Sequence, residues 1–345
     1  MPPTESARER RRIALSVLEQ SPVTSGSTPA MALGETVELA CLAEQLGYRR
    51  FWLAEHHNTT SIAGTAPEIL LTHIAGETGS IKVGTGGVLL SYYSPLKVAE
   101  TFRTLEALFP GRIDLGLGRA DGADPPAVIA LHDARDLATA MPYQDKVSTL
   151  LAYLEGDAEG ERPDVVAMPT GAGSPEVWVL ASSIVGAELA AVQGLPFCFA
   201  HFISPTFGAR VTASYRRLYR PSKRWPEPKI MVGVSVMCAP DQYEAERMAA
   251  SADIWHLSSE GTGRGPLPTY AEAARFRPNQ LQTELLNQQR QRRVAGSPES
   301  VLAALTDIAV AYEADELVLR TVCPDPKDRA RSFELVAEAF ARSGL

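Results

Sequence analysis

The chain has 345 residues, 45% of them hydrophobic, and a formal net charge of -8 at pH 7. This length and composition indicate a globular protein with a substantial core. The acidic balance argues against a general nucleic-acid or anionic-membrane surface, so small molecules are the expected partners.

Residues 1–12 contain four arginines and almost nothing apolar, which predicts a flexible N-terminal arm; a basic arm for an anionic partner is the alternative. No stretch approaches the roughly 18 apolar residues of a membrane span, and the N-terminus lacks the apolar core of a secretory signal. A cytoplasmic protein is therefore expected. The four cysteines form no CxxC pair, which argues against a zinc module or a disulfide framework.

From residue 13 onward, short β-rich runs alternate with longer helical patterns, which is the order of βα units around a parallel sheet. Eight such units can be counted. They predict a single (β/α)8 TIM barrel over residues 13–345 rather than a doubly wound sheet. The expected strands begin near Ile13, Arg50, Ile81, Arg112, Val177, Pro196, Ile230 and Glu316.

The helical segments have clear ends. Apolar residues at helical spacing between Leu33 and Leu46 predict one helix, which Gly47 ends, and Pro95 opens another. Two stretches, 120–142 after the fourth strand and 251–298 after the seventh, exceed ordinary connections. Long loops at the carboxyl ends of barrel strands often cover an active site, so 251–298 is predicted to be a lid insertion.

The second expected strand ends in Glu55-His56-His57. In a strand, Glu55 and His57 share one face while His56 takes the other, so a metal held by both histidines would need a local twist. No third clear ligand is near in the sequence, and no metal site is predicted. Imidazole titrates near neutral pH and strand C-termini face the site of a barrel, so this cluster indicates acid/base residues.

The fourth expected strand, Arg112–Arg119, alternates apolar residues with Asp114, Gly116 and Gly118. The glycines are expected to point inward and leave room for a flat ligand, with Arg119 at the strand end to meet an anion. Glycines placed for core packing and a surface ion pair of Arg119 are the alternative. A dinucleotide fingerprint is excluded, because Asp121 stands at the third glycine position.

Two further patterns bear on a ligand site. Gly86-Gly87 in the third strand indicates a bulge, a strained peptide or a close approach of the backbone to a ligand, with a packing adjustment as the alternative. Ser182 and Ser183 precede a helix expected from about Val185. Serines and free N–H groups at a helix N-terminus form a phosphate site, although an ordinary N-cap looks the same in sequence.

Four motifs together, AEHHN, VGTGGVLL, PGRIDLGLGRADG and ASSIVGAELAAVQGLP, resemble the bacterial-luciferase-like flavin monooxygenases. The resemblance covers roughly residues 13–340. Within that superfamily the chain is most similar to the luciferase-like oxygenases found in bacteria and in aromatic polyketide pathways of the mensacarcin type. The motifs are specific for the superfamily and much less so for any substrate.

The resemblance implies roles for particular residues. It places Glu55, His56 and His57 beside the isoalloxazine, with His56 as the acid/base group, and a cis peptide at Gly86-Gly87 under the ring. It implies phosphate binding by the residues Arg119, Ser182, Ser183 and Gly186, with Gly118 next to the flavin. This chain departs from luciferase at Ser182, Gly186 and Gly118, where luciferase has glutamate, threonine and cysteine, so light emission is not inferred.

The implied activity is an FMN-dependent, two-component monooxygenase. Reduced FMN, supplied by a separate NAD(P)H:flavin reductase, would react with O2 to a C4a-(hydro)peroxyflavin that oxygenates a small organic substrate, for example an aromatic or polyketide compound. A homodimer is implied as well. His201, Phe202 and Tyr93 are expected to line the substrate region. Two alternatives stay open: a hydride-transfer oxidoreductase that uses the deazaflavin F420, and a non-catalytic flavin-binding protein.

Overall fold

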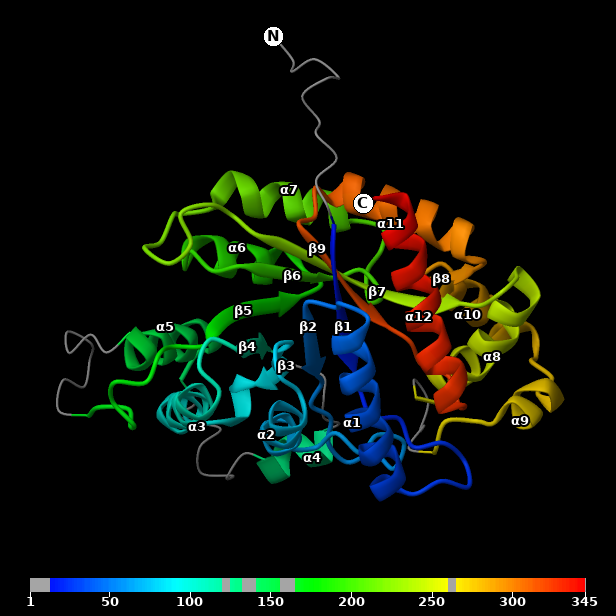
Figure 1. Ribbon diagram of the computed structural model, residues 1–345, viewed down its shortest axis with the longest axis horizontal. Coiled ribbons are helices and arrows are strands. Elements are labelled where there is room, and N and C mark those ends of the chain that lie inside the picture. Colours follow the sequence, from blue (N-terminus) through cyan, green and yellow to red (C-terminus); the bar gives the residue numbers. More distant parts are fainter. Residues whose placement is uncertain (1–12, 120–124, 132–140, 156–164, 260–264, 345) are drawn as a thin grey trace, which may run out of the picture.

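The computed structural model describes residues 13–119, 125–131, 141–155, 165–259 and 265–344. In this part of the chain all strands are parallel and belong to one sheet, and eight of them close into a barrel because β6 pairs with both β5 and β7 (Figure 1). The order around the ring is β1, β2, β3, β4, β5, β6, β7, β9. The predicted (β/α)8 barrel is confirmed. The strands are β1 Ala14–Glu19, β2 Arg50–Leu53, β3 Lys82–Leu89, β4 Ile113–Gly118, β5 Glu176–Ala181, β6 Phe197–Ala200, β7 Ile230–Cys238, β8 Arg293–Gly296 and β9 Glu316–Arg320.

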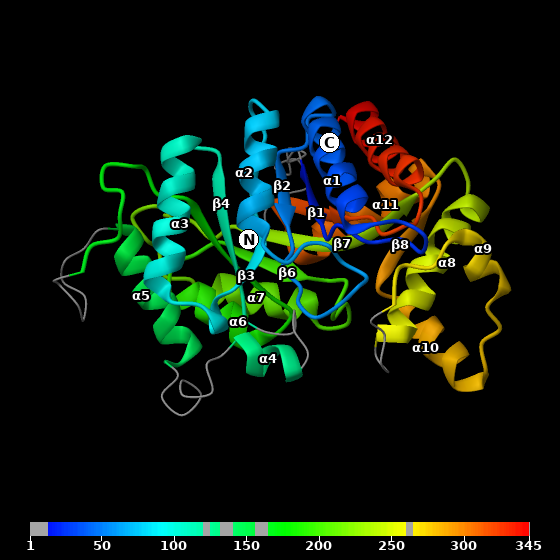
Figure 2. The same ribbon diagram turned by 90° about the horizontal axis from the view of Figure 1, so that it is seen from below.

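Helices surround the ring, and α8, α9 and α10 form a separate group at one side of it (Figure 2). The helices are α1 Pro29–Gln45, α2 Pro67–Glu77, the 3-10 helix η2 Leu90–Tyr92, α3 Pro95–Leu108, α4 Pro125–Leu131, α5 Tyr143–Glu155, α6 Ile184–Val192, α7 Gly208–Leu218, α8 Gln242–Ser259, α9 Tyr270–Arg275, α10 Gln280–Arg290, α11 Pro298–Tyr312 and α12 Pro326–Ser343.

Local sequence signals account for the helix ends. Ser94 caps α3, whose first residue is Pro95, and Gly47 follows α1 with a φ of +79°, as the sequence predicts. The outer faces of the strands and the inner faces of the helices form one large apolar core. Packing of this core orients the strands, and the site residues at the strand ends are oriented with them.

The barrel interior is layered because every second residue of each strand points inward. Near the amino ends of the strands lies a charged layer of Arg50, Asp114, Glu176 and Glu316, joined by hydrogen bonds and ion pairs. The middle layer is apolar. Its members are Leu18, Trp52, Ala54, Trp178, Cys198, Met231 and Val318. Because side chains fill the charged and the apolar layer, a ligand can bind only at the carboxyl-terminal rim of the barrel.

The insertion after β7 differs from the expected loop. Its described residues continue α8, form α9 and α10, and add the short strand β8, which pairs with β7 outside the ring. Thr269 and Asn279 are the N-caps of α9 and α10, and each forms a capping box. Residues 1–12, predicted to be a flexible arm, and residues 260–264 of the insertion lie outside the described part.

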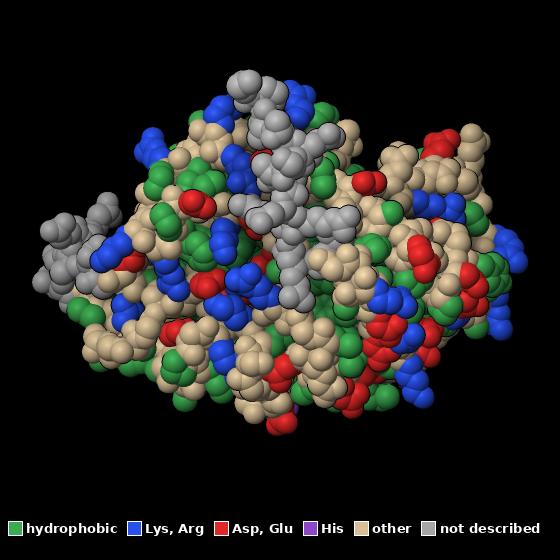
Figure 3. Space-filling model, turned by 45° about the horizontal axis from the view of Figure 1, so that its top comes forward, with side chains coloured by type: hydrophobic (Ala, Val, Ile, Leu, Met, Phe, Trp, Pro, Cys, Tyr) green, Lys and Arg blue, Asp and Glu red, His purple; other side chains and the backbone are tan. Residues whose placement is uncertain are grey.

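Acidic and basic side chains are interspersed over the face shown in Figure 3, which presents no uniformly basic surface. A separate finding concerns membranes: none of the described helices combines the length and the apolar character that crossing a bilayer requires. Likewise, the described residues contain no cluster of three or more metal-ligating side chains.

Candidate functional site

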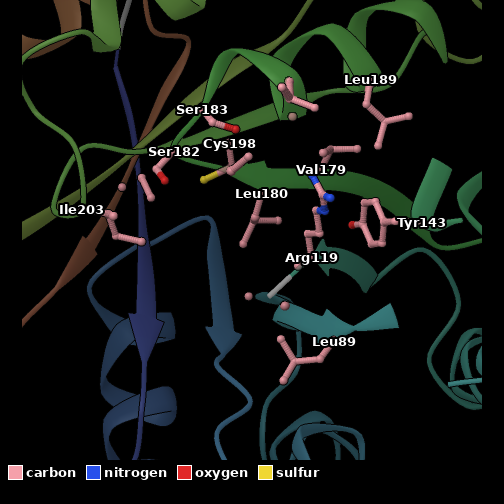
Figure 4. Close-up of a pocket in the computed structure, with 18 of the residues that line it drawn as sticks. Leu89, Arg119, Tyr143, Val179, Leu180, Ser182, Ser183, Leu189, Cys198 and Ile203 are labelled. Atoms are coloured by element: carbon pink, nitrogen blue, oxygen red, sulfur yellow. The ribbon is translucent and has the colours of Figure 1, made fainter. Parts of the chain in front are cut away.

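A pocket of about 1060 Å³ opens at the carboxyl-terminal rim of the barrel. It is lined by strand ends and by residues of α5 and α6, and Figure 4 draws part of its wall. Such a volume suits a cofactor together with a substrate. The sequence-predicted residues that line it are Glu55, His56, Gly86, Gly87, Gly118, Arg119, Ser182, Ser183, Gly186 and Phe202.

One end of the pocket is built for an anion. Ser183 is the N-cap of α6 but makes no side-chain cap hydrogen bond, so the first backbone N–H groups of the helix are available to a ligand. Arg119 is exposed, lines the same pocket and forms no ion pair with any described residue. Its guanidinium points between Val179 and Tyr143 (Figure 4).

The Tyr143 hydroxyl also lies at this end of the pocket. The sequence motifs did not predict it. It is buried and has no hydrogen-bond partner among the described residues, although Tyr143 lines the pocket. Burial raises the pKa of this phenol, and Arg119 partly offsets the rise, so the hydroxyl stays protonated and can donate. Tyr143 opens α5 directly after the 120–142 insertion, and no motif marks it.

Backbone forms the floor of the pocket where glycines replace side chains. The Gly86-Gly87 peptide is cis, as the resemblance implied. A Cβ at Gly87 would stand 2.5 Å from the Gly116 carbonyl oxygen, whereas one at Gly118 would meet nothing closer than 3.5 Å. Gly86 and Gly87 therefore serve close packing under the pocket, while Gly118 leaves open space for a flat ligand.

Glu55 is held by three hydrogen bonds. Its carboxylate accepts from the Tyr93 hydroxyl at 2.6 Å and from the Leu89 backbone N–H at 3.0 Å, and it lies 2.8 Å from His57 Nε2. Glu55 lines the pocket, but neither His57 nor Tyr93 does. These two predicted site residues therefore lie behind Glu55, where they fix its position.

His56 lines the pocket together with Glu55, because β2 ends at Leu53 and the strand alternation expected to separate the two residues does not extend to them. Its backbone N–H donates to the Gly64 carbonyl at 3.0 Å, its Nε2 is 3.5 Å from Gln20 Nε2, and its buried Nδ1 has no partner in the described chain. Burial lowers the pKa of His56 to about 4, and the neighbouring Arg320 and His57 add to this effect. At neutral pH the imidazole is uncharged and can accept a proton.

Two further sequence predictions concern residues that do not line the pocket. His201 does not line the pocket, because its Nδ1 is 2.7 Å from the Tyr312 hydroxyl and its ring packs on that tyrosine. No described residue of the 251–298 insertion lines the pocket either. Of the substrate-lining predictions only Phe202 is at the wall, and the lid role of 251–298 stays a prediction.

A Gly186→Ala substitution is expected to destabilise the fold, because its Cβ would lie 2.2 Å from that of Ala181 in β5. Overpacking of this kind costs about 1–3 kcal/mol. Urea unfolding followed by circular dichroism measures the change. Gly76→Ala in α2 is the matched control: its Cβ meets open space, so stability should hold or rise. Equal losses in both variants would contradict the packing argument.

Known proteins are similar to this chain in fold and in sequence. Residues 12–316 match the sequence model of a family described as luciferase-like monooxygenase. The chain is 35% identical to a luciferase-like monooxygenase of Escherichia coli over 332 residues, 95% of this chain and 97% of that protein. It is 32% identical to the N-acetyl-S-alkylcysteine monooxygenase of Bacillus subtilis over 338 residues, 95% and 98% of the two chains.

Solved structures extend the comparison. The crystal structure of apo-MsnO8 superposes with a TM-score of 0.87 at 41% identity, covering 96% of this chain and 98% of that one. The fold alone is shared with the oxygenating constituent of 3,6-diketocamphane monooxygenase from Pseudomonas putida, in complex with FMN (TM-score 0.70, 19% identity, 96% and 98% covered). It is shared too with an F420-dependent secondary alcohol dehydrogenase (TM-score 0.68, 15% identity, 95% and 99% covered).

Proposed function

Because this chain belongs to the luciferase-like monooxygenase family, we propose that it is an FMN-dependent monooxygenase that oxygenates a small organic substrate with O2. The anion-binding end of the rim pocket carries this proposal. The pocket is lined by an arginine that pairs with no acidic residue of the described chain, by a helix start whose N-cap side chain makes no cap hydrogen bond, and by Tyr143, whose buried hydroxyl has no partner among the described residues. A flavin mononucleotide has a phosphate for this end and a flat ring for the glycine floor.

The residues present fit the cofactor. Arg119, Ser182, Ser183 and the start of α6 would hold the phosphate, and the ring would lie over Gly86-Gly87 in the space left by Gly118. When bound, reduced FMN supplies the electrons that activate O2 for transfer of one oxygen atom to the substrate. The apolar walls contributed by Trp52, Val179 and Leu180 exclude water from this reaction.

His56 is the proposed acid/base residue. It lines the pocket, and its lowered pKa keeps it neutral at working pH, which suits a proton acceptor better than a proton donor. Glu55, fixed by His57 and Tyr93, places a second polar group on the same wall. The two adjacent histidines therefore have different roles in this proposal: His56 is the reactive residue, and His57 supports Glu55.

The outer end of the pocket favours FMN over a deazaflavin. Asp145 of α5 and Glu188 of α6 also line the pocket. The side chain of F420 continues beyond its phosphate into several carboxylates, which these acidic residues would repel, whereas FMN ends at the phosphate. FMN is therefore the preferred cofactor, and F420-dependent hydride transfer is the second candidate, consistent with the F420-dependent fold neighbour.

A competition experiment separates the candidates. Purified protein is titrated with oxidised FMN, reduced FMN and F420, and then supplied with a flavin reductase, NADH, ¹⁸O₂ and N-acetyl-S-methylcysteine, a thioether of the class in one relative's name. We expect FMN to bind more tightly than F420 and ¹⁸O to enter the thioether only with reductase present. Tight F420 binding without O2 consumption would reject the proposal. FMN binding without product from the thioether or from 1-naphthol, an aromatic probe, would favour a flavin-binding protein.

An Arg119→Ala substitution should raise the FMN dissociation constant about 10- to 100-fold, the value of a charge-assisted hydrogen bond. Arg119 is exposed, so the unfolding free energy should change little. Fluorescence quenching of FMN gives the constant. Arg210→Ala, an exposed arginine of α7 that does not line the pocket, is the control. An unchanged constant in Arg119→Ala would remove this residue from the phosphate site.

The partners are part of the same proposal. The sequence lacks the dinucleotide fingerprint, so a separate NAD(P)H:flavin reductase is proposed to deliver reduced FMN. Homodimerisation is proposed from the resemblance alone. Omission of the reductase in the experiment above tests the first proposal, and sedimentation equilibrium tests the second.

A further inference from the structure

A buried arginine, Arg320, lies behind the pocket wall and does not itself line the pocket. Arg320 is the last residue of β9, two positions beyond Val318, which lines the pocket from inside the barrel. Alternation along the strand therefore turns Arg320 inward at the carboxyl-terminal rim. Its guanidinium lies over the ring of Phe202, 4.4 Å from the centroid, and Phe202 is part of the pocket wall.

The charge of Arg320 is poorly compensated. The residue is only 8% exposed, it forms no ion pair within the described chain, and its Nε has no hydrogen-bond partner. Burial lowers its pKa to about 10, and Glu19 only partly offsets this effect. Glu19 itself is paired with Arg329 at 3.2 Å. A buried cation kept without its own carboxylate is costly, which points to a role beyond stability.

Gln20 connects this cation to His56. Arg320 Nη1 donates to Gln20 Oε1 at 3.4 Å, and Gln20 Nε2 lies 3.5 Å from His56 Nε2. Since the guanidinium can only donate, it fixes the amide with its oxygen toward Arg320 and its NH2 toward His56. An NH2 group facing a ring nitrogen needs that nitrogen as an acceptor, so the His56 proton belongs on Nδ1.

We propose that Arg320 is a positioning residue that, through Gln20, holds His56 as a neutral imidazole with its proton on Nδ1. The cation opposes a second proton on the ring, while the oriented amide selects the tautomer. The inference deepens the acid/base role of His56 and rests on the proposed function only for its catalytic consequence. The protonation state itself can be measured without cofactor or substrate.

The charges around His56 are few in the described chain. Arg320 of β9 and the adjacent His57 oppose its protonation. On the far side of Arg320 lie Glu19 of β1 and His256 of α8, and burial followed by Arg320 lowers the pKa of His256 to about 4 as well. His256 therefore reports on the charge of Arg320, its Nδ1 lies 2.6 Å from the Ala252 carbonyl oxygen, and it serves as an internal reference.

The experiment is a pH titration by NMR of the protein with ¹⁵N-labelled histidine, with His56 assigned by its loss in His56→Gln. In Arg320→Met the pKa of His56 should rise from about 4 toward 6.5 by about one unit or more, and that of His256 should rise too. In Arg320→Lys both should stay low. In Gln20→Leu, which keeps the cation, the Nδ1–H tautomer of His56 should be lost while His256 is unchanged.

Arg331→Met removes an exposed arginine of α12 and should alter neither histidine. If His56 keeps its pKa in Arg320→Met, or if wild-type His56 carries its proton on Nε2, the inference is wrong. If Arg320→Met does not fold, the variants Arg320→Lys and Gln20→Leu still test the inference. A raised pKa of His56 in Arg320→Lys, or an unchanged tautomer of His56 in Gln20→Leu, would overturn it. None of these outcomes depends on FMN, so a failure here is distinct from a failure of the proposed function.

Discussion

An Arg50→Met substitution is expected to destabilise the folded barrel by about 3–5 kcal/mol, the cost of leaving buried charges without their partner. The guanidinium is fully buried and bonds to Asp114 at 2.7 Å, Glu176 at 2.9 Å and Glu316 at 3.1 Å. It also lies over the Trp178 ring at 4.9 Å. With methionine in its place, Lys82 and the partly exposed Arg49 remain as the cations paired with this group among the described residues.

Chemical unfolding in urea, followed by tryptophan fluorescence, measures the loss. Arg49→Met is the matched control, since Arg49 precedes Arg50 and also pairs with Glu316, at 3.8 Å, but 46% of its side chain is exposed. Exposed pairs contribute about 0–1 kcal/mol, so this variant should unfold close to the wild-type midpoint. Similar midpoints for the two variants would show that the interior network does not stabilise the barrel as argued.

The pH dependence provides an independent check. Burial opposes ionisation of Glu176, but Arg50 and Lys82 outweigh it and lower the pKa of Glu176 to about 2. A carboxylate with a lowered folded-state pKa contributes its stability above its ordinary pKa of 4.5 and loses it as the pH falls toward 2. The difference between wild type and Arg50→Met should therefore shrink between these pH values, and a constant difference would argue against the ion pair as its cause.

A His56→Ala substitution is expected to lower product formation about 10²- to 10⁴-fold, the usual contribution of a general acid or base. FMN affinity should be nearly unchanged, because the phosphate contacts lie at the other end of the pocket. Product is measured by ¹⁸O incorporation into the probe that the wild type oxygenates, N-acetyl-S-methylcysteine or 1-naphthol. His73→Ala, an exposed histidine of α2, is the control. Wild-type rates in His56→Ala would exclude the acid/base role.

The lowered pKa of His56 also predicts how stability changes with pH. Because burial and Arg320 disfavour its protonated form, the unfolded chain binds this proton more readily than the folded one. The contribution is therefore complete above pH 6.5 and is lost as the pH falls toward 4. The His56→Ala variant should show a weaker dependence on pH over this interval in urea unfolding; an equally steep dependence would contradict the lowered pKa.

The sequence by itself determined the fold and much of the rim. Strand and helix periodicities are local, so eight βα units and the helix boundaries at Pro95 and Gly47 could be read directly. The motifs also located most of the pocket wall, because barrel strands present their carboxyl ends on one side. The cis peptide at Gly86-Gly87 came from the resemblance and is confirmed.

Only the tertiary structure decided which member of a motif faces the pocket. Glu55, His56 and His57 are adjacent in sequence, yet Glu55 and His56 line the pocket, whereas His57 does not and lies 2.8 Å from the Glu55 carboxylate. Tyr143 and Arg320 carry no local signal, since the burial that leaves the Tyr143 hydroxyl and Arg320 Nε without a hydrogen-bond partner among the described residues exists only after distant elements have packed. Periodicity records which way a side chain points, whereas burial, charge compensation and pKa depend on neighbours that are hundreds of residues away in the chain, as Gln20 and Arg320 are.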